Sequence, residues 1–283
     1  MHIRNPVEWG VDQIRYASTA IEQIGHTRHR EIPLPGIRRI EIAELGKVMA
    51  RGLEDFAAYR TDVAFLCVIY PLAGLVLARL VFGYELLPLL FPLASGFALI
   101  GPVAAVGLYE LSRRREAGAA AGWADAFAVL RSPAFGTIVA FGLLLMAIFL
   151  VWLNVAILIY DATLGPEPPA SLYGFASDIL TTRSGWAMIV IGCGVGFLFA
   201  CLVLAISVVS VPLILDREVG LGVAIQTSLR AVAANPGPMA AWGLVVAGGL
   251  VLGSLPLFLG LIVVMPVLGH ATWHLYRRVV APG

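Results

Sequence analysis

The chain has 283 residues, of which 59% are hydrophobic and only 13% are charged, and its formal net charge is +1. Because a soluble domain carries about one-quarter charged residues, this composition excludes an ordinary soluble protein. A net charge so close to zero also argues against a nucleic-acid-binding protein, which needs a basic surplus on one face. The composition predicts a protein whose exterior contacts lipid.

Residues 1–60 are the most polar part of the chain, and we predict a cytoplasmic segment of amphipathic helices there. Apolar residues recur at helical spacing over roughly 6–24 and again over 42–56, with a breaker-rich link between the two stretches. Such helices can lie on the membrane surface or dock a partner. They can equally fold against the protein's own loops, and the pattern leaves both interpretations open.

Residues 61–283 are predicted to form an all-α, polytopic membrane domain with about six transmembrane helices. A helix needs about 20 apolar residues to cross the hydrocarbon, where its backbone groups must be satisfied within the helix. The last apolar block is too long for one span and is interrupted by Gly253 and Pro256, so we predict two helices there. The six predicted spans cover 62–82, 86–111, 135–160, 186–213, 239–254 and 256–276.

Two short amphipathic helices, at about 121–131 and 220–233, are predicted to lie at the cytoplasmic interface between spans. Each follows a similar turn, Arg115-Glu116 in one case and Arg217-Glu218 in the other, which suggests a weak internal repeat. Lys and Arg mark cytoplasmic segments. Nearly all basic residues fall inside when both termini are cytoplasmic, so we predict that orientation.

His270 and His274 lie one helical turn apart in the last predicted span, which is the spacing of a possible metal or haem ligand pair. Trp273, Tyr276 and Arg277 beside them are typical of a structural anchor at the membrane interface, which is the interpretation we favour. A haem-binding oxidase core would need several more intramembrane histidines on other helices. We therefore predict no metal site and no cofactor.

Arg79, Glu85 and Asn154 are the residues that could form a polar site within the membrane. Ionisable groups are expensive to bury in hydrocarbon and are therefore functional hypotheses. Arg79 is close enough to the outer interface to extend its guanidinium to water, and it could also pair with Glu85. Asn154 is a candidate for an interhelical hydrogen bond.

Small residues repeat at four-residue spacing at Gly192 and Gly196, and again at Gly249 and Gly253. This spacing lets membrane helices approach closely, so we assign these glycines to helix packing. The sequence has no Walker motif, metalloprotease helix or Ser-His-Asp set. We therefore predict that the protein is not an enzyme.

Five stretches of the sequence carry a family resemblance: 55–62, 107–114, 206–220, 234–239 and 269–278. In these motifs the chain resembles an uncharacterised bacterial integral-membrane family catalogued as domain of unknown function 2189. The resemblance implies a multi-pass protein of the bacterial inner membrane. It brings no established substrate, cofactor or catalytic residue.

We expect a non-enzymatic accessory, assembly or scaffolding component, because no row of charges crosses the predicted spans and several helices are interfacial. The alternative is a small-solute or lipid transporter, for which the repeat and the proline-interrupted first two spans are the motivating features. A haem- or metal-linked respiratory component of the cytochrome oxidase type is the third hypothesis. The expected partners are the lipid bilayer and other membrane proteins, and not nucleic acid.

Overall fold

The computed structural model describes residues 34–67, 87–119, 122–167 and 171–282, with single positions at 72, 76, 79 and 169. These residues form helices and one isolated bridge between Ile37 and Val280, and they contain no strand. The expected all-α class is confirmed. The helix expected over 6–24 lies outside the described residues.

The elements are α2 (Ile42–Cys67), η1 (Leu87–Leu89), α4 (Leu90–Ala104), α5 (Val106–Glu116), η2 (Trp123–Arg131), α6 (Phe135–Thr163), α7 (Leu172–Thr181), α8 (Arg183–Ser207), α9 (Ser210–Arg217), α10 (Leu221–Ala234), α11 (Pro236–Ser254) and α12 (Leu261–Val279).

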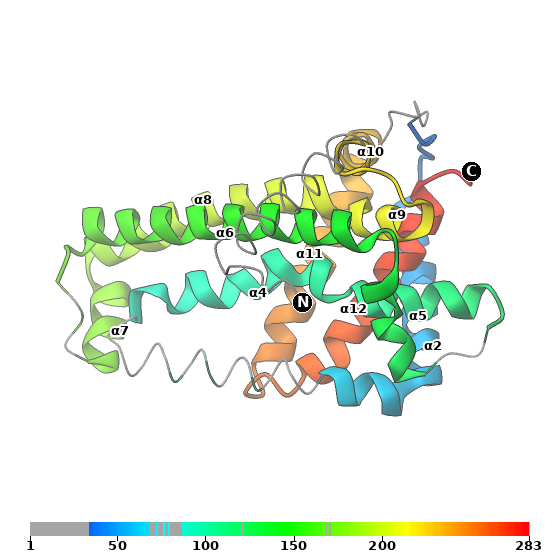
Figure 1. The fold of residues 1–283 in the computed structure, drawn as a ribbon. Coiled ribbons are helices and arrows are strands. Elements are labelled where there is room, and N and C mark those ends of the chain that lie inside the picture. Colours follow the sequence, from blue (N-terminus) through cyan, green and yellow to red (C-terminus); the bar gives the residue numbers. More distant parts are fainter. Residues whose placement is uncertain are drawn as a thin grey trace, which may run out of the picture. The chain divides into compact units, whose positions relative to one another are not determined.

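Three segments of the described chain are long and apolar enough to cross a membrane: α6, α8 together with α9, and α11. They coincide with the spans expected at 135–160, 186–213 and 239–254. Figure 1 shows α6 and α8 lying side by side, and their apolar side chains are mostly exposed. Exposed apolar faces on long helices are what lipid contact requires, because lipid tails are as apolar as the side chains themselves.

The other expected spans are less regular. The span 86–111 is divided among η1, α4 and α5, and the helix is interrupted at Ala105, three residues after Pro102. In the span 256–276, a turn precedes α12, which begins only at Leu261. Most of the span 62–82 lies outside the described residues, so the count of six spans stays a prediction.

The two short helices expected between spans are present, as η2 and α10. Their preceding turns differ, because the left-handed residue is Gly118 in the first turn and Glu218 in the second. η2 is a 3₁₀-helix whereas α10 is an α-helix. The location of both helices at the membrane interface, and the internal repeat, stay predictions.

The most extensive contact between two helices joins α2 to α12, which run antiparallel. Beyond their ends, Arg38 N donates to Val279 O (2.8 Å) and Ala281 N donates to Gly36 O (2.9 Å). α2 spans Ile42–Cys67 with a kink at the non-helical residue Tyr59, where two helical segments meet, and the domain boundary expected near residue 60 stays a prediction. The sequence left open whether residues 42–56 lie on the membrane surface, dock a partner or fold against the protein itself. In the structure, this helix packs on α12 of the same chain.

Asn235, in the turn between α10 and α11, holds the segment that leads into α2. Its side-chain oxygen accepts from Ile40 N (2.8 Å), and its side-chain nitrogen donates to Arg38 O (3.0 Å). The residue is buried, and a buried amide needs such partners because an unpaired one is costly. One polar side chain therefore fixes the start of α2 against a turn almost 200 residues away in the sequence.

Gly52 marks the closest approach of α2 to α12, and it generates a testable prediction. A Cβ at Gly52 would lie 2.7 Å from Ala271 Cβ and 2.8 Å from Val267 O, and backbone atoms cannot move aside easily. We expect Gly52→Ala to lower the free energy of unfolding by about 1–3 kcal/mol through overpacking. Gly46 on the same helix has no atom within 4 Å of that position, so Gly46→Ala should be neutral or stabilising. Equal effects in detergent denaturation would contradict the packing.

Candidate functional site

Three helices bring four polar side chains together in the interior: Asp55 from α2, Ser112 from α5, and His270 and His274 from α12. Ser112 Oγ lies 2.6 Å from Asp55 Oδ2 and 2.8 Å from His270 Nδ1, and His274 Nε2 lies 2.8 Å from Asp55 Oδ2. Asp55 is 5% exposed and His270 is 0% exposed. Burial of this kind is tolerated because each of the four side chains has at least one hydrogen-bond partner in the cluster.

The Asp55 carboxylate is the acceptor at the centre of this cluster. It receives hydrogen bonds from Ser112 and His274 and an ion pair from Arg115 Nη1 at 2.6 Å. Burial by itself would raise the pKa of Asp55, but the hydrogen bonds from His274 and Ser112 outweigh it, so the pKa lies below its ordinary value. The carboxylate is therefore ionised and can only accept.

The position of the protons follows from that acceptor. Because Ser112 gives its one proton to Asp55, its oxygen must accept from His270 Nδ1. This assigns the neutral tautomer of His270 with the proton on Nδ1. Nε2 of His270 is then an unprotonated lone pair, and it is buried without a hydrogen-bond partner among the described residues.

A second set of hydrogen bonds continues from this cluster toward α9. Glu116 accepts from Trp273 Nε1 (3.0 Å) and from Arg277 Nε (3.0 Å), and Asp216 accepts from the hydroxyl of Tyr276 (2.5 Å). Burial alone would lower the pKa of Arg277, but the charges of Glu116 and Asp216 raise it. We call the whole set the polar junction: Asp55, Ser112, Arg115, Glu116, Asp216, His270, Trp273, His274, Tyr276 and Arg277.

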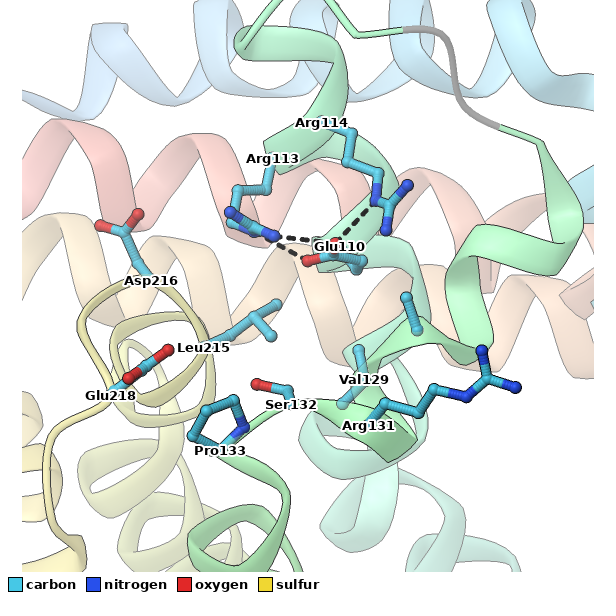
Figure 2. Close-up of a pocket in the computed structure, with 11 residues that line it drawn as sticks. Glu110, Arg113, Arg114, Val129, Arg131, Ser132, Pro133, Leu215, Asp216 and Glu218 are labelled. Carbon is cyan, nitrogen blue, oxygen red and sulfur yellow. Dashed lines mark hydrogen bonds and ion pairs between the residues drawn. The ribbon is translucent and has the colours of Figure 1, made fainter.

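Beside the junction, a polar pocket of about 290 Å³ opens between the end of α5, the end of α9 and the start of α6. Glu110 accepts from Arg113 (2.7 Å) and Arg114 (2.8 Å), and its hydrogen bond is the main cause of the raised pKa of Arg113. Figure 2 shows Asp216 and Glu218 on one side of this pocket and Arg131 on the opposite side.

A second cavity, of about 260 Å³, is almost entirely apolar and lies among α4, α6, α7 and α8. Trp152, Tyr160 and Gly192 line it. Trp152 is buried, and its indole N–H donates to Ser95 Oγ at 3.0 Å. Tyr160 and Cys193 are the titratable side chains in its lining, and the hydroxyl of Tyr160 donates to Glu167 O at 2.6 Å.

The structure gives His270 and His274 surroundings different from those of an anchor at the membrane surface. Trp273 and Tyr276 beside them are also buried, and both donate to carboxylates. The ring nitrogens engage Ser112 and Asp55 rather than converging on one point. Among the described residues, no group of three or more His, Cys, Asp and Glu side chains could hold a metal ion.

The residues expected to form an intramembrane polar site do not gather in the described part of the chain. Asn154 is on an exposed face of α6, where its side-chain nitrogen donates to Leu150 O of the same helix at 2.8 Å. Arg79 is helical and exposed, and Glu85 lies outside the described residues. A role for these three residues stays a prediction.

The glycines expected to pack helices divide into two groups. A Cβ at Gly196 would lie 3.1 Å from the Trp152 ring, one at Gly249 would lie 3.3 Å from Val264, and one at Gly253 would lie 2.7 Å from Leu261. These three therefore allow close contacts within the chain. Gly192 has no atom within 4 Å of the same position, so any close helix packing there would need a partner outside the described residues.

Asp55, Ser112 and Arg115 were not singled out from the sequence. One signal was available for Asp55: it follows Val48 by seven residues and Gly52 by three, which places all three on one face of α2. A carboxylate on an otherwise apolar face indicates a buried partner. Ser112 and Arg115 sit in an Arg-rich helix end, where nothing in the local pattern distinguishes them.

Long apolar helices together with a buried polar junction define the class of an integral membrane protein. Residues 90–216, from the start of α4 into α9, match the model of a family described as predicted integral membrane protein, domain of unknown function 2189. This match, over somewhat less than half of the chain, supports the family resemblance seen in the sequence. No curated protein and no solved structure matches the chain.

Removing the Asp55 carboxylate should destabilise the fold strongly. Asp55→Ala leaves Arg115, Ser112 and His274 without their shared acceptor, so we expect a loss of about 3 kcal/mol in the free energy of unfolding. Glu54, its neighbour, is exposed, and Glu54→Ala should change stability by less than about 0.5 kcal/mol. Denaturation of both purified variants in the same detergent checks this, and similar losses would refute a central role for Asp55.

The same carboxylate predicts a pH dependence. Because the folded-state pKa of Asp55 is lowered from its ordinary value of 3.8, its contribution is complete above that pH and is lost as the pH falls through the lower folded-state pKa. Melting temperatures of the wild type and Asp55→Asn should therefore converge below about pH 4. Parallel curves for the two proteins from neutral to acidic pH would show that Asp55 is not the titrating group.

Proposed function

We propose that the protein is a non-enzymatic accessory, assembly or scaffolding component of the bacterial inner membrane, with both termini and the polar junction on the cytoplasmic side. The observation that carries this proposal is the mutual pairing of the junction's ionisable groups. Asp55, Glu116 and Asp216 all accept hydrogen bonds from neighbours in the same protein. Carboxylates engaged in this way serve as structural links between helices and offer no free base to a substrate.

The exposed apolar faces of the long helices support an assembly role. Leu143 on α6 and Val190 and Phe197 on α8 are 67%, 67% and 66% exposed. Such surfaces contact either lipid or the helices of another membrane protein. A rigid polar junction at one end and open apolar helices beyond it suit a protein that positions other helices within the bilayer.

The other two functions draw less support from the described residues. A transporter needs polar groups that line a path through the apolar spans, and Asn154 bonds instead to its own helix. A haem-linked component needs axial ligands aimed at a common centre. The bonded nitrogens of His270 and His274 are directed at Ser112 and Asp55.

The proposal is tested by affinity purification from native membranes in mild detergent, followed by mass spectrometry and an optical spectrum of the same sample. We expect one membrane complex of reproducible stoichiometry and no pigment. A clean, colourless single protein would overturn the scaffold proposal and would bring transport assays in liposomes forward. A visible absorption band that purifies with the protein would instead favour the redox function.

A pair of glycine variants makes that test specific. Gly194 is exposed, with open space where a Cβ would lie, whereas Gly196 contacts Trp152. We expect Gly194→Leu to retain the wild-type melting temperature but to reduce recovery of a partner at least about threefold, because it obstructs a surface open to other helices. Gly196→Leu should lower the melting temperature. Unchanged partner recovery with Gly194→Leu would exclude this face of α8 as the contact.

A further inference from the structure

We propose that the polar pocket between α5, α9 and the start of α6 binds the headgroup of a zwitterionic phospholipid that carries a primary ammonium and a phosphate, of the phosphatidylethanolamine type. This inference goes beyond the accessory role and does not depend on it. It rests on the charges of the pocket, on their separation, and on where the pocket lies relative to the apolar helix α6.

The pocket carries both signs of charge on opposite sides. Figure 2 shows Asp216 and Glu218 on the α9 side, Arg131 on the η2 side, and Ser132 and Pro133 between them. The upper wall is formed by Glu110 with its two arginines, Arg113 and Arg114. Three arginines and three carboxylates line the pocket, so its net charge is zero although its two sides differ.

Two exposed charges on opposite sides of the pocket are available to a ligand. Arg131 and Glu218 are exposed, and neither has an ion-pair partner among the residues that the structure describes. Glu218 is also the left-handed residue that ends α9, with φ of 52°. A non-glycine residue in that conformation is uncommon, and here it fixes the point from which the carboxylate leaves the backbone.

A headgroup with separated charges fits this arrangement better than a simple anion does. An ammonium would lie beside Glu218 and Asp216, while a phosphate would lie toward Arg131 and the hydroxyl of Ser132. A headgroup that is only anionic would meet the exposed carboxylate of Glu218, which has no ion-pair partner among the described residues. The pocket volume of about 290 Å³ suits a small polar group rather than a whole lipid.

The location of the pocket points to a membrane lipid as the source of that group. Ser132 and Pro133 precede α6, which is a membrane-length apolar helix. From its first residue α6 carries an exposed apolar stripe of Phe135, Val139 and Leu143, spaced four residues apart on one face. A headgroup held in the pocket would place its acyl chains along this stripe. The headgroup would then lie among polar side chains and the acyl chains among apolar ones.

Lipid binding to the purified, delipidated full-length protein in detergent tests the proposal by native mass spectrometry. The probes are phosphatidylethanolamine, phosphatidylglycerol and phosphatidylcholine with identical acyl chains. We expect phosphatidylethanolamine to bind most tightly, and Glu218→Gln and Arg131→Gln each to weaken it about tenfold. Arg230, an exposed arginine on α10 outside the pocket, provides the control, and Arg230→Gln should leave binding unchanged.

Three outcomes would overturn the proposal. The first is equal or tighter binding of phosphatidylglycerol, with no loss in Glu218→Gln, which would indicate an anion site. The second is equal weakening by Arg230→Gln, which would indicate non-specific attraction to the basic surface. The third is displacement of the lipid by glycerophosphoethanolamine at an equal concentration, because a ligand without acyl chains would then suffice.

Discussion

The buried carboxylate of Asp55 is the interaction on which the arrangement of the polar end of this protein depends. It accepts from Ser112 on α5 and from His274 on α12, and it pairs with Arg115 on α5, so one side chain of α2 ties together three helices. A buried carboxylate is stable only when hydrogen-bond donors surround it. Removal of one donor therefore destabilises the whole set of interactions around the charge. The antiparallel packing of α2 on α12, with Gly52 allowing the close approach, brings the carboxylate within reach of its partners.

The protein combines two kinds of helix–helix contact that obey different physical rules. At the buried part of the polar junction, around Asp55 and His270, hydrogen bonds are strong because the local dielectric constant is low. Along α6, α8 and α11, the surroundings are apolar, so burial of apolar area gives no driving force and close contact depends on small residues. Gly196 against Trp152 and Gly249 against Val264 are contacts of this second kind. The junction therefore provides the directional specificity that apolar contacts in a membrane lack.

The boundary between these two environments is also where the pocket lies. α5 and α9 end there with a surplus of charged residues, and the apolar helix α6 begins there at Phe135, two residues after Pro133. Charged side chains at such a boundary remain in contact with water or lipid headgroups, while the helices beyond it meet only hydrocarbon. The dipolar arrangement of Glu218 and Arg131 on opposite sides of the pocket follows from the ends of two helices, α9 and η2, that approach it from different directions.

Local composition is enough to predict the class of protein, the all-α fold and the positions of the long apolar helices. A backbone in hydrocarbon must satisfy its own hydrogen bonds, so each apolar run had to be a helix whatever its neighbours were. The polar junction, in contrast, is visible only in the folded chain. Asp55 and His274 are 219 residues apart, and no local pattern connects them. The same is true of the contact of Asn235 with the start of α2, and of the burial of Trp273 and Tyr276, whose composition is equally typical of a membrane interface. Hydrophobic periodicity shows which face of a helix is buried, but which other helix covers that face depends on packing across the whole chain.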